Sequence, residues 1–161
     1  MYFNKTDLPI NKEMFNFWND NGFLIIEDFK SHKECDELIN RSKELIEEQD
    51  FNNQKSVFDT VSQSHNDDNY FLDSGDKIRF FFEEKANLEE ENIKTNKHYI
   101  VNKIGHALHD LDEKFVKFSK SEDLDLIAKA IGFKNPLLLQ SMYIFKQPKI
   151  GGEVVCHQDS T

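Results

Sequence analysis

The triplet His157-Gln158-Asp159, close to the end of the chain, carries the residue types that bind a divalent metal ion. An imidazole and a carboxylate two residues apart on a strand point to the same face, so both can converge on one ion. They would supply two members of the two-histidine, one-carboxylate set that holds non-haem iron. The chain ends at Thr161, before a third ligand occurs. The triplet predicts an oxygen-activating iron site in an incomplete copy.

The chain contains a second pair of this type, His65-Asn66-Asp67, in a polar stretch. With 6 His and 15 Asp in 161 residues, chance alone gives ~0.6 such pairs, so spacing by itself has little weight. The setting separates the two pairs. His157 follows a long apolar segment and a Gly151-Gly152 turn, a device often found beside active sites. On pattern alone, a surface His and Asp at a strand end remains an open alternative.

The element expected to position this triplet is a strand over residues 137–147. Its odd positions are mostly apolar, and its even positions include Gln140 and Met142 on one face. Apolar residues on both faces are typical of a central strand in a larger sheet. We therefore expect the sheet to continue beyond this strand.

The first part of the chain predicts helices with a short strand between them. Residues 11–21 form an apolar face and stop at Gly22, which indicates a helix. Residues 23–26 are expected to form a buried strand. Ser31 and Glu34 have the spacing of a capping box, which opens a helix through Gln49.

The middle of the chain predicts a polar loop with little core over 50–69, a strand over 77–82 and an acidic connector over 83–97. Helical spacing then follows. The apolar stripe consists of Val101, Ile104, Leu108, Leu111 and Phe115. A further helix is expected between a Ser121 cap and Gly132. Helices come first and strands gather at the end, so the sequence predicts a single α+β domain over residues 1–161.

Composition narrows the class of protein. The net charge of −10 argues against a nucleic-acid partner or an anionic membrane surface, because both require clustered Lys and Arg. Two cysteines in unlike contexts give no disulfide framework, which favours a reducing compartment. The first residues lack the apolar run of a signal peptide, and no later run has the length of a membrane span. We expect a soluble cytoplasmic protein.

Four blocks of sequence carry a joint resemblance to a known family. They are Gly75-Asp-Lys-Ile-Arg-Phe-Phe-Phe-Glu83, Asn102-Lys-Ile-Gly-His-Ala-Leu-His109, Gln140-Ser-Met-Tyr-Ile-Phe-Lys-Gln-Pro148, and Gly151-Gly-Glu-Val with the His157 triplet. In this order and spacing they resemble the phytanoyl-CoA dioxygenase family. The resemblance implies N-terminal helices packed on the start of a double-stranded β-helix (jelly roll), truncated here. It also implies an Fe(II)- and 2-oxoglutarate-dependent dioxygenase of the hydroxylase type that uses O₂.

The resemblance assigns roles by position. His157 and Asp159 correspond to the first two iron ligands. Lys103 corresponds to a lysine that pairs with a 2-oxoglutarate carboxylate, and Met142 to a residue of the cosubstrate pocket. From the residues alone, Lys103 would be a solvated helix lysine and Met142 ordinary core packing. The family's distal His ligand and its carboxylate-anchoring Arg have no counterpart in this chain.

Three other side chains are expected to have structural roles. His106 and His109 are interpreted as helix-surface or core histidines rather than ligands, and Cys156 as a small buried apolar residue.

Three functions remain open. The leading interpretation is the dioxygenase, with a small-molecule substrate and an inactive 161-residue chain. The second is a non-catalytic truncated product that binds or regulates a partner through an exposed sheet edge. The third is a different metal-dependent enzyme, such as a hydrolase with zinc at the His-x-Asp pair.

Overall fold

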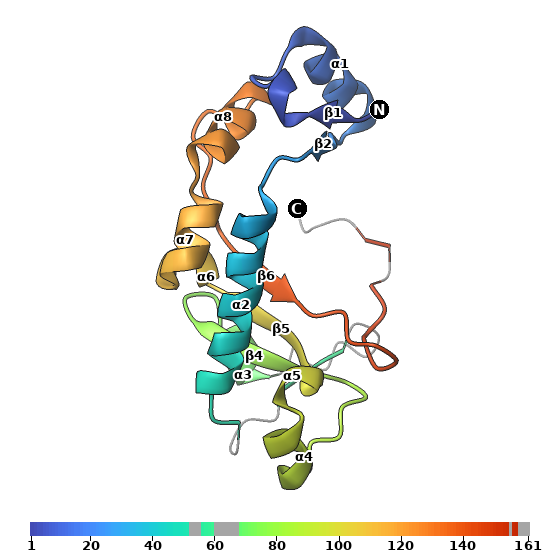
Figure 1. Cartoon of the computed structure of the whole chain (residues 1–161), viewed down its shortest axis with the longest axis vertical. Coiled ribbons are helices and arrows are strands. Elements are labelled where there is room, and N and C mark those ends of the chain that lie inside the picture. Colours follow the sequence, from blue (N-terminus) through green and yellow to red (C-terminus); the bar gives the residue numbers. More distant parts are fainter. Residues whose placement is uncertain (52–55, 60–67, 155, 158–161) are drawn as a thin grey trace.

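The computed structural model describes residues 1–51, 56–59, 68–154 and 156–157. The molecule is elongated (Figure 1), with a small N-terminal unit at one end and a four-stranded sheet toward the other. A long helix, α2 (His32–Glu48), runs between them. Helices and a sheet share one core, which confirms the expected α+β class.

The N-terminal unit is held by a two-stranded parallel sheet. Its elements are β1 (Phe3–Asn4), the 3₁₀ helix η1 (Lys5–Asp7), α1 (Lys12–Asn21) and β2 (Ile26–Glu27). Helix α1 begins and ends as the sequence predicts. The Asn11 side chain accepts a hydrogen bond from the Met14 amide at 3.0 Å, and Gly22 ends the helix with a φ of 77°.

The buried strand expected over 23–26 is wrong in its extent. Pairing begins only at Ile26, while Phe23 and Ile25 are 48% and 38% exposed. The partner strand β1 has just two residues, so it offers hydrogen bonds to a short stretch only.

Helix α2 confirms the capping box. The Ser31 hydroxyl accepts from the Glu34 amide, and the Glu34 carboxylate accepts from the Ser31 amide at 2.9 Å. The second half of the apolar stripe, Leu45 and Ile46, is buried in the core. In the first half of α2, Leu38 is partly buried against the core, whereas Cys35 and Ile39 are exposed where the helix extends beyond the sheet.

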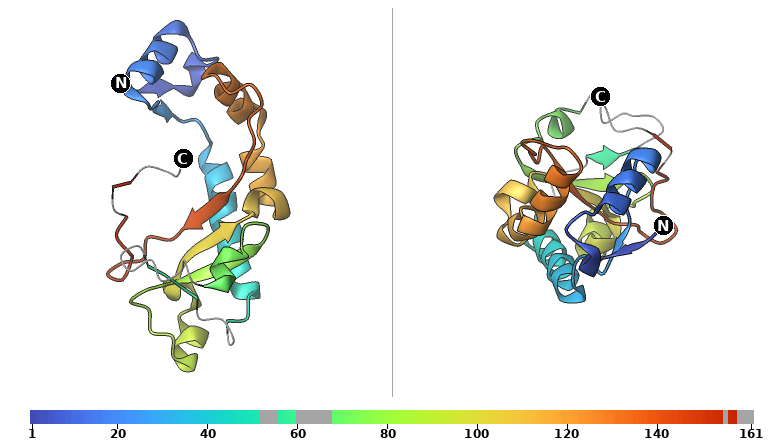
Figure 2. Two further views of the ribbon diagram at one scale, coloured as in Figure 1. Left: turned by 180° about the vertical axis from the view of Figure 1, so that it is seen from behind. Right: turned by 90° about the horizontal axis from the view of Figure 1, so that it is seen from above.

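The main sheet has the strand order β3-β4-β5-β6 (Figure 2). Its strands are β3 (Val57–Phe58), β4 (Ile78–Glu83), β5 (Val101–His106) and β6 (Ser141–Ile144). β3 is parallel to β4, and the other neighbours are antiparallel. The core lies between this sheet and the helices. Its buried members are Leu45, Ile46, Phe51, Phe80, Phe82, Ile93, Ile100, Val101, Ile104, Leu108 and Phe115.

The helix expected over 101–115 is wrong in its first half. Residues 101–106 are β5, and the helical part begins with α6 (Leu108–Leu111) and α7 (Glu113–Ser119). β5 is buried along its whole length, because β4 and β6 flank it on both edges. A strand buried on both faces shows no alternation, so its apolar residues matched a helical spacing by coincidence.

The polar stretch and the acidic connector hold more structure than expected. The polar stretch contains β3, and α3 (Asn69–Leu72) begins at its end. The connector contains α4 (Glu90–Thr95), and α5 (Lys97–Ile100) begins at its end. Phe51 is only 1% exposed and belongs to the core, which contradicts the expectation of little core in this stretch.

Helix α8 (Glu122–Ala130) is confirmed and is joined to the N-terminal unit. The Lys30 ammonium donates to the Ser121 hydroxyl at 2.8 Å and to the Asp123 carboxylate at 2.8 Å. The capping role expected for the Ser121 side chain is not realised, because this hydroxyl accepts from Lys30 and makes no capping hydrogen bond.

The strand expected over 137–147 is shorter, and it does not lie at the centre of a sheet. β6 covers residues 141–144, and among the described strands it pairs with β5 alone. Leu137 and Leu139 are 80% and 82% exposed. A strand needs a neighbour to satisfy its backbone groups, so the outer edge of β6 limits its length.

Candidate functional site

Lys103 lies in the middle of β5, with an exposed fraction of 3%. Its ammonium is 3.2 Å from the ring centroid of Phe58 and 5.3 Å from the rings of Phe71 and Phe81. The same nitrogen contacts the sulfur of Met142 at 3.8 Å. The structure therefore brings the two sequence-predicted cosubstrate residues, Lys103 and Met142, into contact. The ammonium lies among three aromatic rings, whereas Met142 is 46% exposed, so the alternative of ordinary core packing for Met142 is wrong.

The Lys103 ammonium lacks an anionic neighbour in the described part of the chain. No salt bridge joins it to a described Asp or Glu, unlike the half-buried pair of Lys30 with Asp123. Burial lowers the pKa of Lys103 to about 8. Cation–π contact offsets only about 0.5–2 kcal/mol of such burial. The alternative of a solvated helix lysine is wrong, and the cluster has the chemistry to receive a carboxylate.

His106 borders the same cluster and stays neutral. Its ring packs on Phe71 and Phe81, with centroids 5.5 and 5.4 Å away. The Ser74 hydroxyl lies 2.6 Å from His106 Nδ1 and donates to the Phe71 carbonyl, so Nδ1 must carry the proton and donate to Ser74. Burial, and then the Lys103 charge, lowers the pKa of His106 to about 4. At neutral pH, therefore, Lys103 carries a positive charge and His106 is neutral.

The interpretation of His106 and His109 as core histidines is confirmed. They are 3% and 2% exposed. His109 Nδ1 lies 2.8 Å from the Ser141 hydroxyl, and its Nε2 lies 3.1 Å from the Leu138 carbonyl. These contacts fix the segment before β6 against α6.

A well-anchored turn leads from β6 toward His157. The Phe145 amide donates to the Asn102 carbonyl at 2.7 Å, and the Gln147 side chain donates to the Val101 carbonyl at 3.1 Å. The Gly151 amide then donates to the Gln147 carbonyl at 3.0 Å. A Cβ on Gly151 would lie 2.7 Å from that carbonyl oxygen, so the turn requires glycine there. The turn expected at this point is confirmed.

Replacing Gly151 with alanine is expected to lower the free energy of unfolding by about 1–3 kcal/mol, because the backbone of Gln147 must move. Chemical denaturation measures this loss. Gly75→Ala is the matched control, since a Cβ there meets nothing within 4 Å. Equal stability of the two variants would contradict the steric argument.

His157 is exposed and lies beyond this turn. Residues 151–154 and 156–157 belong to no strand, so the strand end expected there is not seen among these described residues. Asp159 and Gln158 lie outside the described residues, as do His65 and Asp67.

The buried position expected for Cys156 is wrong, because the residue is exposed. No described strand lies against this segment, so nothing covers the side chain.

The residue types of the His157 triplet fit Fe(II), but the described residues do not complete a metal site. Within the described ranges, no group of three His, Cys, Asp or Glu side chains converges on a point. Those ranges provide one of the predicted ligands, His157. The Lys103 cluster, in contrast, has the charge and the burial that suit an anionic group.

The sequence did not predict the rings of Phe58, Phe71 and Phe81 around the Lys103 ammonium, or the hydrogen bond between His106 and Ser74. Phe58 lies within the polar stretch that was expected to be a loop, and Phe71 follows shortly after it. Large aromatic residues within a polar segment were the available signal, because each buries a large apolar area.

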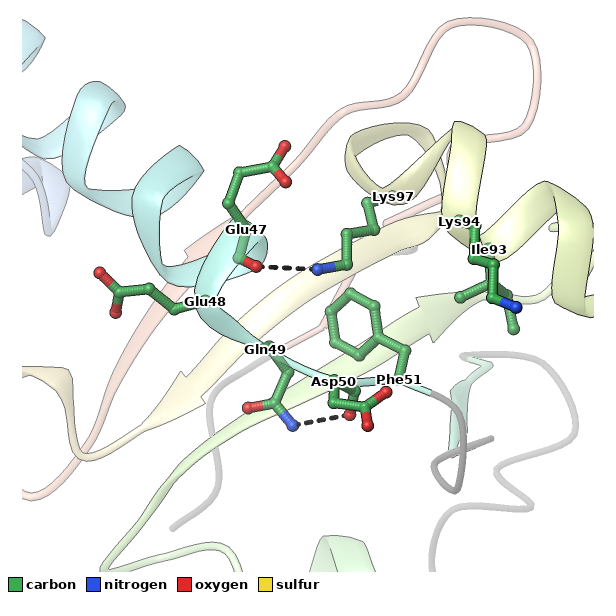
Figure 3. A pocket seen from close by; sticks show the side chains of 8 residues that line it. All are labelled: Glu47, Glu48, Gln49, Asp50, Phe51, Ile93, Lys94 and Lys97. Carbon is green, nitrogen blue, oxygen red and sulfur yellow. Dashed lines mark hydrogen bonds between the residues drawn. The ribbon is translucent and has the colours of Figure 1, made fainter.

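A separate surface hollow of about 320 Å³ lies where α2 ends (Figure 3). The Lys97 ammonium donates to the Glu47 carbonyl at 2.9 Å and lies 5.6 Å from the Phe51 ring. The lining consists of Glu47, Glu48, Gln49, Asp50, Phe51, Ile93, Lys94 and Lys97. Neither Lys103 nor Met142 lines it, so it is distinct from the candidate site.

Among the described helices, none combines the length and the apolar character needed to cross a bilayer.

The chain is similar to one known protein family and to several of its members. Residues 18–161 match the family described as Phytanoyl-CoA dioxygenase (PhyH). The chain is 43% identical over 152 residues to "Phytanoyl-CoA dioxygenase" of Arabidopsis thaliana, covering 94% of this chain and 53% of that protein. It is 44% identical over 154 residues to "Phytanoyl-CoA dioxygenase domain-containing protein 1 homolog" of Dictyostelium discoideum, covering 96% and 54%. It is 41% identical over 161 residues to the Danio rerio protein of that type, covering 97% and 54%. The chain spans about half the length of these relatives.

Proposed function

Because this chain belongs to the phytanoyl-CoA dioxygenase family, we propose that it is the N-terminal part of an Fe(II)- and 2-oxoglutarate-dependent dioxygenase domain. The observation that carries the proposal is the buried Lys103 ammonium beside Met142, without a described carboxylate partner. Residues 1–161 would then contribute the helices and the first strands of a jelly roll, and further strands would pair with the outer edge of β6.

Different residues of this chain would bind the cosubstrate and the metal ion. Lys103 would hold one carboxylate of 2-oxoglutarate, with Met142 against the chain of the cosubstrate. His157 and Asp159 would hold Fe(II). When both are bound, they supply the oxidation of a substrate C–H bond by O₂ with conversion of 2-oxoglutarate to succinate and CO₂.

Water exclusion is the second contribution of this part of the chain. The rings of Phe58, Phe71 and Phe81 surround the Lys103 ammonium and lower the local dielectric. A charge-assisted hydrogen bond gains strength in such surroundings. His106 stays neutral there, so the pocket would present one positive charge to one carboxylate.

The substrate would be a small molecule that is not strongly anionic. The chain has a net charge of −10, which disfavours a polyanionic ester unless a local basic patch receives it.

The test compares the 161-residue chain with a complete protein that carries it. We expect the complete protein to form succinate from 2-oxoglutarate in an Fe(II)-dependent manner. The 161-residue chain is expected to bind Fe(II) weakly and to form no more succinate than its own His157→Ala variant, because it lacks a third ligand and the second carboxylate anchor. Succinate above that control would contradict the proposed incompleteness.

Two other outcomes would favour the alternative functions. Zinc retained in the complete protein, with no use of 2-oxoglutarate, would indicate a metal-dependent hydrolase. A natural 161-residue product that binds a longer copy without turnover would indicate a regulatory module.

A further inference from the structure

Glu83, the last residue of β4, is a buried carboxylate whose two oxygen atoms differ in their hydrogen-bond partners. It is 1% exposed. Its Oε2 atom accepts from the Asn102 side-chain amide at 3.0 Å and from the Gly152 backbone amide at 3.0 Å. Its Oε1 atom is buried and has no hydrogen-bond partner among the described residues. A carboxylate in this position is costly to bury, so its contacts require an explanation.

The contact with Gly152 joins two segments that lie 69 residues apart in sequence. The Gly152 carbonyl is also held, by the Lys146 ammonium at 3.2 Å. Both backbone polar groups of Gly152 are therefore satisfied by side chains. An ideal Cβ on Gly152 would lie 3.7 Å from Glu83 Oε2, so the backbone passes close to the carboxylate. Residue 152 is thus a fixed point of the chain.

Asn102 connects the same turn at its beginning. Its carbonyl accepts from the Phe145 amide at 2.7 Å, while its side chain donates to Glu83. The residue next to it, Lys103, carries the ammonium of the candidate site. The turn from Phe145 to Gly152 is therefore tied at both ends to two neighbouring strands, β4 through Glu83 and β5 through Asn102.

The anchor limits where His157 can lie. His157 follows Gly152 by five residues, and five extended residues span at most roughly 18 Å. A mobile turn would widen this range and make approach of His157 to the Lys103 cluster rarer. Holding Gly152 reduces the conformational entropy that ordering of the segment costs.

We propose that Glu83 is a positioning residue, which holds Gly152 so that the segment carrying His157 leaves the sheet at a fixed point near the Lys103 cluster. This inference rests on the proposed function for its purpose, while the anchoring itself rests on the contacts of Glu83. In this proposal Glu83 contacts neither the metal ion nor the substrate.

Glu83→Ala and Glu83→Gln in the complete protein provide the test. Amide hydrogen exchange over residues 150–157, measured without iron, reports the anchoring directly. A hydrogen bond to a charged group is worth a factor of about 10 to 100 in an equilibrium constant, so Glu83→Ala should raise the exchange rate of the Gly152 amide by that factor. Glu83→Gln should restore part of the protection, because one amide oxygen can accept both hydrogen bonds.

Fe(II) affinity is the second measurement. We expect Glu83→Ala to raise the dissociation constant for Fe(II) about tenfold or more, with Glu83→Gln between it and wild type. Asp112→Ala is the matched control. Asp112 is also a buried carboxylate, but it binds Arg41 and caps α7 far from the turn. This control should lower the thermal midpoint and leave both the exchange over residues 150–157 and the Fe(II) affinity unchanged.

Unchanged exchange at Gly152 in both Glu83 variants would overturn the inference. So would increased exchange with unchanged Fe(II) affinity, because the contact would then be structural only. If the wild-type protein binds no Fe(II), the proposed function fails, whereas protection of Gly152 that depends on Glu83 would still support the anchoring. If Glu83→Ala does not fold, Glu83→Gln, which keeps the volume, decides the outcome.

Discussion

Replacing Lys103 with methionine is expected to raise the 2-oxoglutarate requirement of the complete protein about ten- to a hundredfold. A charge-assisted hydrogen bond contributes roughly 1.5–3 kcal/mol, and methionine retains the volume but neither the charge nor the donor. Titration of 2-oxoglutarate at saturating Fe(II) measures the effect. Fe(II) affinity should barely change, because Lys103 is not a proposed ligand.

The same variant should stabilise the protein without its cosubstrate. The Lys103 ammonium is buried among aromatic rings without a described carboxylate partner, so its charge costs free energy when no anion is bound. A methionine sulfur packs well against aromatic rings. A gain of ~1 kcal/mol would raise the thermal midpoint by about 2–8 °C. A side chain that lowers the stability of the folded protein but is required for cosubstrate binding is typical of a functional site.

Lys97→Met provides the matched control. The Lys97 ammonium also lies over a phenylalanine ring, at 5.6 Å, but in the separate hollow at the end of α2. We expect no change in 2-oxoglutarate use for this variant. Superimposable titrations of wild type and Lys103→Met would instead show that the buried ammonium does not bind the cosubstrate.

The pH dependence of both effects follows from the lowered pKa of Lys103. Burial sets this pKa at about 8 in the folded protein, against 10.5 for an unperturbed lysine. Between these values the unfolded chain binds more protons, so the contribution of Lys103 to stability rises with pH in that window. Cosubstrate affinity should fall as the pH rises above about 8, because Lys103 then loses its positive charge. Both trends should be absent in Lys103→Met.

Local signals in the sequence located the longer helices α1, α2 and α8, but missed the short helices α3, α4 and α5 and misplaced the central strand. The caps at Asn11 and Ser31 act within one turn, so the sequence alone reveals them. β5 is different, because its burial comes from β4 and β6, which are distant in sequence. The length of β6 likewise depends on whether a further strand pairs with its outer edge.

The candidate site, too, was predicted only in part from the sequence. The resemblance assigned Lys103 and Met142, and the structure brings them into contact. The residue pattern alone suggested a solvated lysine, because it misplaced Lys103 on a helix. Tertiary contacts over long sequence distances, such as Glu83 with Gly152, leave no local pattern, and neither do the aromatic rings around the ammonium.

Asp159→Ala is expected to abolish turnover in the complete protein, while Asp67→Ala leaves it intact. Both aspartates belong to His-x-Asp pairs, so spacing alone does not distinguish them. The proposal for Asp159 rests on the family resemblance and on the anchored turn that precedes its histidine, His157. Loss of a carboxylate ligand removes a metal–oxygen bond and the negative charge that partly neutralises Fe(II).

Two measurements on these variants decide the assignment. Succinate formation reports turnover, and Fe(II) titration reports the ligand directly. Asp159→Ala should lose both, and Asp159→Glu should recover part of the Fe(II) affinity, because it restores the carboxylate at a slightly longer reach. Asp67→Ala should match wild type in both measurements, since the resemblance assigns no role to the first pair. Equal losses in Asp67→Ala and Asp159→Ala would show that the position of a pair after the anchored turn does not select the metal ligand.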